Sequence, residues 1–579
     1  MSDVQMQVHA ARDDLLTAGL GEAGLRSASP PAFANPDQPT VAELRQRAIW
    51  VNWRGIADLA PGGGFGEFYG SVAAIPGREF HALARLPGRR QPHRVMLQLP
   101  ESFDLAQRCV IVAASSGSRG IYGAISLAGA WGLPRGCAVA YTDKGAGTGY
   151  VDTADGRAIG LDGRSTPDAA AGEFRAPPYA GPGIAPIAVK HAHSGDNPEA
   201  DWGRHLQQAA AFALQVLSSE RADGGPWTFD NTHVIAVGVS NGGSAVLQAA
   251  ALPGAWLDGA VAIAPNVHSG TGGRAAYDYA TEAALLMPCA LTAPAFDRLA
   301  FARPGGQASP AGRARCASLH RLGELSGNDP QEQAEQAHDR LRASGWTDAA
   351  LEAAALSTAF DLWRAIAVTY ASAYARTGAD QMPCGYRIAA LDASGAARAP
   401  TASEREAWWS DASGIPPGAG VGILDGLANG EDAALPGLQC LRALWTQGAG
   451  AVVDGVAQTR VALPRPGLPL LVLQGTDDGL IPEAFSAEPY ARWVRSEGGA
   501  LGYWRIANAQ HFDAFLGLPA LSARYVPLMP YGYRALEAMW AHVAQGQPLP
   551  GDADIGTTPR RIENGAVAPL RPDNLGTLP

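Results

Sequence analysis

The chain has 579 residues, of which 47% are hydrophobic, so it can bury at least one large core and a disordered protein is excluded. Its formal net charge is −11 and it carries no Lys/Arg-rich block, so nucleic acid is not an expected partner. No run of about 18 apolar residues predicts a membrane span.

The first residues, MSDVQMQVHAARDDLL, lack the basic and apolar regions of a secretory signal, so the sequence as it stands predicts a cytoplasmic protein. None of the six cysteines lies in a CxxC or Cys/His cluster with metal-ligand spacing, and we expect no metal. Cys109 and Cys137 open apolar runs, where a buried free thiol is expected. Disulfides stay open for the others, which are Cys289, Cys316, Cys384 and Cys440.

Short apolar runs rich in β-branched residues predict the strands of a sheet. In the first half of the chain they begin near residues 94, 109, 137, 233 and 259, separated by helical or glycine-rich segments. Two more begin near residues 468 and 500. Continuous apolar runs suit strands that are buried on both faces of a parallel sheet. The predicted fold class is therefore α/β, with a mostly parallel sheet.

The interval 270–455 differs in composition from its flanks. It is rich in Ala, Glu, Gln and Arg, and it contains helical stretches such as 348–378. We therefore predict a core formed by residues 1–269 and 456–579, with a mainly helical domain inserted into it. Beyond about residue 546 the chain is rich in Pro and Gly and aperiodic, which predicts an extended surface segment.

The stretch HVIAVGVSNGGSAVLQAAALPG brings a strand, a tight turn and a helix together around Ser240. Such a turn lifts a serine hydroxyl above the end of a sheet and points the amino end of the helix at the developing oxyanion. Gly238 and Gly242 stand where a side chain would crowd the turn. A serine between glycines can also form a turn that has no catalytic role. The hypothesis that Ser240 is a nucleophile therefore also requires a base and an acid elsewhere in the sequence.

A serine nucleophile needs an imidazole to take its proton and a carboxylate to orient the imidazole, and in this kind of sheet they follow in the order Ser, acid, His. Asp478, after the run LPLLVLQG, is the acid candidate, and its neighbour Asp477 is the alternative, with a turn or capping role expected. His511, after the next run, is the base candidate. His268 is a weaker rival that we expect to line the pocket.

An oxyanion hole needs one backbone amide after the nucleophile and a second from an early loop. Asn241 supplies the first, and the candidates for the second are Ser116, Gly117 and Ser118, which follow the run CVIVAAS. Arg119 in the same loop is a candidate for binding a substrate carboxylate, with a solvated loop residue as the alternative. A serine triad requires no cofactor, so none is expected.

Four stretches resemble the D-(-)-3-hydroxybutyrate oligomer hydrolases: DDLLTAGLG, VIVAASSGSRGIYGAI, AVAYTDKGAGTGY and VIAVGVSNGGSAVLQAA. The second and third are long and idiosyncratic, so they are more specific than the serine turn alone. The resemblance covers most of the chain. It implies an α/β-hydrolase fold, a small-molecule oligoester as partner, and hydrolysis of the ester bonds of short (R)-3-hydroxybutyrate oligomers in polyhydroxybutyrate degradation. It also implies a secreted or periplasmic location.

Two other functions stay open. Tannases and feruloyl esterases are similar in layout, but they typically carry a cysteine pair at positions held here by Val239 and Gln510. A non-catalytic binding protein built on this fold usually lacks a triad member, whereas Ser240, Asp478 and His511 are all present. The sequence specifies no oligomeric state.

The interval between Ser240 and Asp478 is longer than a minimal hydrolase requires, so we predict that residues 270–455 form a lid. Most aromatic residues there are expected in internal packing, but some should face the serine, and Trp408 and Trp409 are candidates for substrate binding. A lid that narrows the mouth suits a small soluble oligomer and disfavours the surface of a crystalline polymer.

Overall fold

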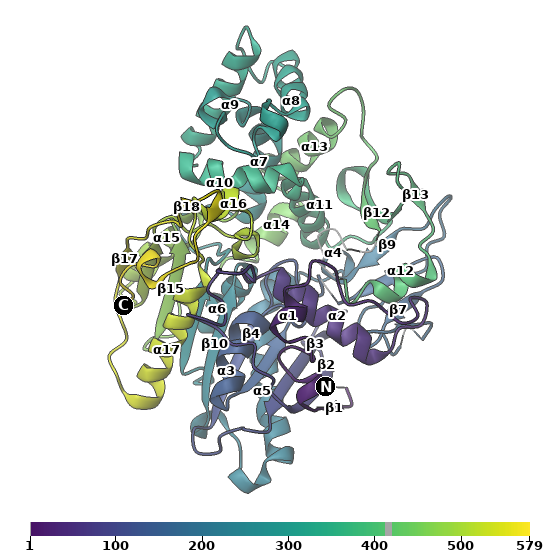
Figure 1. Ribbon diagram of the computed structural model, residues 1–579. Coiled ribbons are helices and arrows are strands. Elements are labelled where there is room, and N and C mark those ends of the chain that lie inside the picture. The colour runs from purple at the N-terminus through teal and green to yellow at the C-terminus, as the bar shows by residue number, and fades with distance from the viewer. Residues whose placement is uncertain (1, 147, 169, 412–417, 419) are drawn as a thin grey trace.

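The centre of the molecule is a ten-stranded sheet with the order β1-β2-β3-β5-β4-β10-β11-β15-β16-β17. The computed structural model describes residues 2–146, 148–168, 170–411, 418 and 420–579. In chain order the strands of this sheet are β1 (Gln5–His9), β2 (Gly77–Ala84), β3 (His93–Pro100), β4 (Cys109–Ala114), β5 (Ala138–Thr142), β10 (His233–Val239), β11 (Gly259–Ile263), β15 (Leu470–Gly475), β16 (Gly502–Ile506) and β17 (Ala553–Ile555). Figure 1 shows the sheet in the lower part of the molecule.

Seven neighbouring strands, from β5 to β17, run parallel to one another. The remaining strands, β1, β2 and β3, pair antiparallel at one edge of the sheet. The predicted mostly parallel sheet is therefore confirmed, and each apolar run interpreted as a strand lies in it. Every residue of β4 and of β11 is buried, as expected for strands covered on both faces.

Helices cover the two faces of the sheet. On one face, α5 (Pro198–Glu220) and α6 (Asn241–Ala250) share a hydrophobic cluster with the strands. On the other, α2 (Val41–Arg54) and α17 (Met529–Gln545) belong to a second, larger cluster. Because parallel strands all end at one edge, the loops after β4, β10, β15 and β16 come together there.

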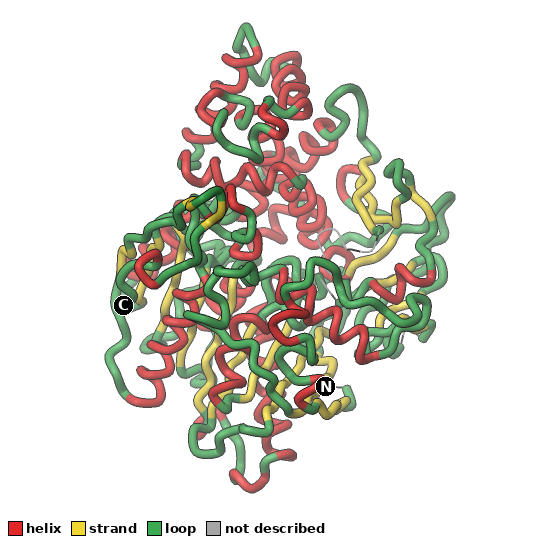
Figure 2. Tube along the Cα trace, in the orientation of Figure 1, coloured by secondary structure: helices red, strands yellow, loops and turns green. Residues whose placement is uncertain are grey.

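Between β11 and β15 the chain leaves the sheet and forms a separate group of helices, which Figure 2 shows in red above the strands. These helices are α7 (Ala276–Ala290), α8 (Pro310–Arg321), α9 (Pro330–Ala343), α10 (Asp348–Ala359), α11 (Leu362–Ala375), α12 (Ala402–Ala407), α13 (Leu435–Thr446) and α14 (Ala451–Ala457). The helical stretch 348–378 is divided at Asp361, which has a left-handed backbone with a φ of 58°. This group also contains a small antiparallel sheet that the composition did not predict. Its strands are β12 (Tyr386–Leu391), β13 (Ala397–Arg398) and β14 (Val421–Asp425).

A second small sheet lies outside the predicted elements, in the loop region between β5 and α5. Its strands pair antiparallel in the order β8-β7-β6-β9. They are β6 (Tyr150–Asp152), β7 (Arg157–Ile159), β8 (Ser165–Thr166) and β9 (Ile187–Val189). Each strand has only two or three residues, which is too short for an alternating pattern to mark it in the sequence.

All six cysteines form disulfides: Cys109–Cys137, Cys289–Cys316 and Cys384–Cys440. The prediction of free thiols at Cys109 and Cys137 is therefore wrong. The parallel register of β4 and β5 pairs Val110 with Ala138, so the preceding residues, the two cysteines, lie opposite one another with their Cα atoms 4.7 Å apart. Burial was correctly predicted, but the pairing depends on a strand register that the sequence does not display.

Candidate active site

Ser240 lies at the turn between β10 and α6, with a φ of 62° and a ψ of −128°, a backbone conformation that non-glycine residues rarely adopt. Glycine is required on both sides of it. A Cβ on Gly238 would lie 2.3 Å from the carbonyl oxygen of Gly242, and a Cβ on Gly242 would lie 2.6 Å from the carbonyl oxygen of Ala114. The strained turn thus lets α6 pass close to β4 and β10 while the serine side chain stays above the sheet.

A chain of hydrogen bonds joins Ser240 to a histidine and a carboxylate. His511 Nε2 lies 3.0 Å from Ser240 Oγ, and its Nδ1 lies 2.8 Å from Asp478 Oδ2. The other carboxylate oxygen of Asp478 accepts the backbone amides of Leu480 and Ile481 at 2.9 and 2.7 Å. The carboxylate is fully buried, and these two amides fix its orientation toward the imidazole.

Asp477, the alternative acid, has a different environment. Its carboxylate accepts the hydroxyl of Thr476 at 2.7 Å, and burial raises its pKa. The structure therefore places Asp478, and not its neighbour, against His511.

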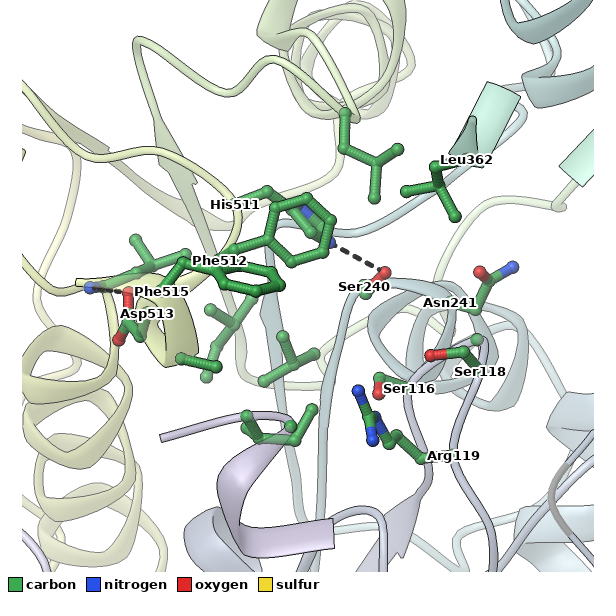
Figure 3. A pocket seen from close by; sticks show the side chains of 18 of the residues that line it. Ser116, Ser118, Arg119, Ser240, Asn241, Leu362, His511, Phe512, Asp513 and Phe515 are labelled. Atoms are coloured by element: carbon green, nitrogen blue, oxygen red, sulfur yellow. Dashed lines mark hydrogen bonds between the residues drawn. The ribbon is translucent and has the colours of Figure 1, made fainter. Parts of the chain in front are cut away.

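The candidate oxyanion amides lie beside the serine. Asn241 is the first residue of α6, and Ser116, Gly117 and Ser118 form the loop after β4. Among the residues that the structure describes, no acceptor takes the backbone N–H of any of these four. The loop and the turn are in close contact, because a Cβ on Gly117 would lie 2.3 Å from Asn241 Oδ1. Figure 3 shows Ser116, Ser118 and Asn241 grouped on one side of Ser240.

The hydroxyl of Ser240 opens into a cavity of about 320 Å³, the size of a small-molecule site. Its wall is mostly apolar and comes from the core and from the inserted helices together. The core contributes Ile56, Val239, Leu528 and Met529, with Phe512 and Phe515 next to His511. The loop before α11 and that helix contribute Phe360, Leu362, Ile366 and Tyr370. Arg119 and Arg54 also line the cavity.

Three other predicted pocket residues do not line this cavity. His268 Nδ1 lies 3.4 Å from Thr459 Oγ1. Burial and the nearby Arg460 lower the pKa of His268 to about 4. Trp408 and Trp409 are buried in the large hydrophobic cluster, where their rings pack against tyrosines of the core. They act in internal packing, which the sequence analysis expected of most aromatic residues in this interval.

A buried polar network behind Asn241 was missed by the sequence analysis. The Asn241 side chain donates to Glu199 Oε2 at 3.1 Å and accepts the Tyr370 hydroxyl at 3.0 Å. Lys144 Nζ donates to Glu199 Oε1 at 2.5 Å and to the Tyr370 oxygen at 2.8 Å. His191 Nε2 is also 2.8 Å from Glu199 Oε1. All five residues are buried, so α11 of the inserted region is fastened to the turn that carries Ser240.

Charge stabilises this network. Burial alone would raise the pKa of Glu199, but Lys144 and His191 lower it to about 2. Burial, together with Lys144, lowers the pKa of His191 to about 4, so the imidazole is neutral near pH 7. Lys144 lies in the stretch AVAYTDKGAGTGY, which contributed to the resemblance but offered no role for the lysine.

Within the described ranges, no group of three or more His, Cys, Asp or Glu side chains is arranged to hold a metal ion. In the same part of the chain, no helix is both long and apolar enough to cross a membrane. The prediction that the protein needs no metal or cofactor stays a prediction.

Comparison with known proteins identifies the family. The family model for 3HB-oligomer hydrolases matches residues 2–578. The chain belongs to the 3HB-oligomer hydrolase family. It is 38% identical to the D-(-)-3-hydroxybutyrate oligomer hydrolase of Burkholderia vietnamiensis, over 98% of this chain and 89% of that one. It is likewise 38% identical to that of Paraburkholderia xenovorans, over 97% and 87%.

Membership in the 3HB-oligomer hydrolase family confirms the resemblance noted in the four sequence stretches. Among solved structures, the chain is similar to tannin acyl hydrolase from Aspergillus niger, with a TM-score of 0.40 and 12% identity over 90% of this chain and 85% of that one. It is also similar to feruloyl esterase B from Aspergillus oryzae, with a TM-score of 0.36 and 11% identity over 86% and 85%.

Proposed function

We propose that this protein is a serine esterase that hydrolyses the ester bonds of short, soluble (R)-3-hydroxybutyrate oligomers. The observation that carries the proposal is the hydrogen-bonded chain from Ser240 through His511 to Asp478, which opens into a small apolar cavity in a member of this family. These are the groups that acyl transfer by a serine requires.

In the proposed reaction, Ser240 Oγ attacks the carbonyl carbon of an ester while His511 takes its proton. The negative oxygen that develops is met by the amide of Asn241 and by amides of the loop at Ser116–Ser118. The bond between the carbonyl carbon and the alcohol oxygen then breaks, and His511 returns its proton to the departing alcohol. Water, activated by the same imidazole, releases the acyl group from Ser240.

The inserted helices act, in this proposal, as a lid over a core formed by residues 1–269 and 456–579. Phe360, Leu362 and Ile366 supply part of the cavity wall, which supports this assignment of residues 270–455. A wall closed in this way admits a short oligomer and keeps bulk water away from the serine. A chain held in a polymer crystal has no comparable access to the cavity.

The test is hydrolysis of purified 3-hydroxybutyrate dimer and trimer by the whole protein, beside methyl ferulate, methyl gallate and a crystalline polyhydroxybutyrate suspension. We expect monomer from the dimer and trimer, and loss of turnover by about 10⁶ in Ser240→Ala. Faster cleavage of the aromatic esters would favour a tannase-like activity instead. Rapid clearing of the polymer would contradict the role of the lid, and binding without turnover would indicate a non-catalytic protein.

A further inference from the structure

Arg119 lines the Ser240 cavity, and its guanidinium forms no ion pair with any residue that the structure describes. Its Nη1 is 3.5 Å from the carbonyl oxygen of Val51, at the limit of a hydrogen bond, and its buried Nε has no partner among the described residues. Burial lowers its pKa to about 10, so the group still carries its charge near pH 7. Figure 3 shows it next to Ser116, which in this view lies between Arg119 and Ser240.

The backbone makes room for this charged group. Gly55, which ends α2, lies directly against it, because a Cβ at that position would be 2.0 Å from Arg119 Cζ. A guanidinium removed from water costs free energy unless hydrogen bonds and an opposite charge replace its hydration. The described residues give this guanidinium neither a full set of hydrogen bonds nor an opposite charge. An anionic ligand would supply both.

Arg54 and Asp513 also line the cavity, and neither forms an ion pair with Arg119. Arg54 is a second guanidinium, and it stacks over Trp50 with its Cζ 5.1 Å from the ring centroid. Asp513 directs its two carboxylate oxygens at the backbone amides of Leu528 and Met529, both at 2.8 Å. The cavity wall therefore combines apolar surface with unbalanced positive charge, a surrounding that favours a carboxylate ligand.

We propose that Arg119 binds the free carboxylate at the end of the oligomer, so that the enzyme cleaves the ester bond nearest that end and releases one monomer at a time. This inference rests on the proposed function. Arg119 directly follows the loop Ser116–Ser118, whose amides are assigned to the oxyanion. In a 3-hydroxybutyrate ester the terminal carboxylate carbon is separated by four bonds, roughly 5 Å, from the carbonyl carbon under attack. One arginine side chain from that loop spans such a distance.

The step balances without another reactant. The carbon–oxygen bond to the last unit breaks, the acyl remainder stays on Ser240 Oγ, and the departing alkoxide takes the proton held by His511. The leaving molecule is 3-hydroxybutyrate, with its carboxylate still on Arg119. An ester in the middle of a long polymer has no carboxylate within reach of this guanidinium, so the same contact selects short oligomers.

The first experiment compares the 3-hydroxybutyrate dimer with its methyl ester, which has the same scissile bond and no charge. We expect Arg119→Gln to lower kcat/KM for the free acid by about 10- to 100-fold, the range for a lost charge-assisted hydrogen bond, and to change the value for the methyl ester by less than about threefold. Arg119→Lys should recover part of the loss. Unchanged methyl ester turnover also shows that the variant is folded.

Arg54→Gln is the matched comparison, because it removes a positive charge from the same cavity. Its effect on the free acid should be several times smaller than that of Arg119→Gln. Equal losses on both substrates, or a larger loss in Arg54→Gln, would overturn the role of Arg119 while leaving ester hydrolysis intact. Failure of the unaltered protein to cleave either substrate would count against the proposed function instead.

The second experiment tests the position of the cut with a trimer whose carboxyl-terminal unit carries ¹³C. Quenched early time points should contain labelled monomer and unlabelled dimer. Unlabelled monomer as the first product would overturn the proposed orientation.

A third experiment measures inhibition, so that it does not depend on turnover of a charged substrate. The 3-hydroxybutyrate anion should compete with the methyl ester in the unaltered protein, and its inhibition constant should be at least about tenfold higher in Arg119→Gln.

Discussion

Asp478 holds the imidazole of His511 through one oxygen and is itself held by two backbone amides through the other. An asparagine at this position would present an amide group to the imidazole and favour the wrong tautomer. We therefore expect Asp478→Asn to lower kcat on the dimer by about 10⁴. Asp477→Asn is the control, with kcat within a few fold of the unaltered protein. A larger loss of kcat in Asp477→Asn than in Asp478→Asn would show that Asp477 is the catalytic acid.

These residues differ in how far the sequence reveals them. Ser240, Asp478 and His511 each follow an apolar run, so strand ends and chain order alone brought them into one hypothesis. Lys144 and Glu199 are separated by 55 positions and meet only because both are buried behind the same turn. In the sequence, Glu199 is an ordinary acidic residue in the first turn of a helix, and no local pattern distinguishes it.

At the scale of elements, the hydroxyl of Tyr370 connects α11 to the serine turn. Tyr370→Phe would leave Asn241 Oδ1 and Lys144 each without one partner in a buried place. We expect kcat to fall about tenfold, the cost of one unsatisfied buried group, with a smaller change in KM. The measurement is steady-state kinetics on the dimer, beside the thermal midpoint.

Tyr374→Phe is the control for that prediction. Tyr374 lies on the same helix, is also buried, and packs its ring against Tyr370 at a centroid distance of 5.7 Å. No hydrogen bond of its hydroxyl is found among the described residues, so kcat should stay within about twofold of the unaltered value. Equal effects in the two variants would mean that the Tyr370 hydroxyl does not position the turn.

The break between α10 and α11 is a helix boundary that the sequence did not predict. The stretch 348–378 is helical throughout in its composition, yet the chain turns at Asp361 and brings Phe360 and Leu362 to the cavity. Asp is one of the few residue types that adopt this left-handed conformation, and its carboxylate accepts a hydrogen bond from Arg364 in the helix that follows. The tail was likewise only partly predicted: it is extended, but β17 pairs with β16 and completes the sheet.

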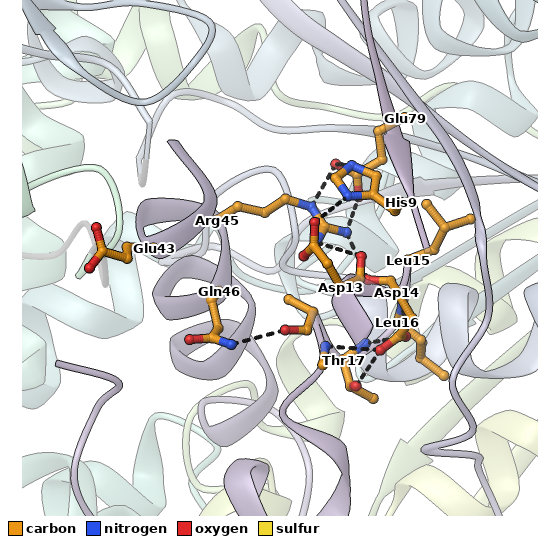
Figure 4. A network of polar contacts seen from close by, with 12 residues as sticks. His9, Asp13, Asp14, Leu15, Leu16, Thr17, Glu43, Arg45, Gln46 and Glu79 are labelled. Atoms are coloured by element: carbon orange, nitrogen blue, oxygen red, sulfur yellow. Dashed lines mark hydrogen bonds and ion pairs between the residues drawn. The ribbon is translucent and has the colours of Figure 1, made fainter. Parts of the chain in front are cut away.

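The N-terminal segment is fastened to the sheet by a buried ion pair, shown in Figure 4. Arg45 of α2 donates to both oxygens of Glu79 on β2, at 3.0 and 2.9 Å, and to Asp13 at 2.8 Å. Arg45→Met leaves the Glu79 carboxylate buried without its main partner. We expect the free energy of unfolding to fall by about 3–5 kcal/mol in urea titrations. Arg12→Met, at an exposed position, should change it by less than about 0.5 kcal/mol.

For the whole molecule, the sheet was predictable because its strands are continuous apolar runs, whereas the inserted helices were assigned to the serine side only by the length of their interval. Their hydrophobic residues belong to one cluster with those of α2 and α17, so they pack against the core. The sequence pattern predicts helices there but does not specify which of their residues contact the core. The contact between Tyr370 and Asn241 is therefore a property of the complete fold.

Buried histidines make the stability of the whole molecule depend on pH. Burial lowers the pKa of His191 to about 4 and that of His193 and His205 to about 3. The unfolded chain takes up protons at these positions below about pH 6.5, while the folded protein does not until the pH approaches those lower values. At these histidines the unfolded state therefore binds more protons in this window, which lowers the free energy of unfolding as the pH falls from about 6.5 to 4. Burial raises the pKa of Asp143 to about 6 and that of Asp513 to about 7, so these two carboxyls act in the opposite direction, and the three histidines outnumber them.

Urea titrations at pH 7.5, 6, 5 and 4 measure that slope. The free energy of unfolding should be greatest at or above pH 7 and decline steadily toward pH 4. His205→Gln, which removes one such group, should flatten the decline even if it also lowers stability at pH 7.5, because a neutral side chain takes up no proton in either state. Glu199→Gln should lower stability at every pH, because it leaves the buried Lys144 without its partner, but it should change the slope of the curve only below about pH 4.5, since the pKa of this carboxyl is lowered to about 2. The same slope in His205→Gln as in the unaltered protein would show that His205 takes up its proton in the folded protein as readily as in the unfolded chain.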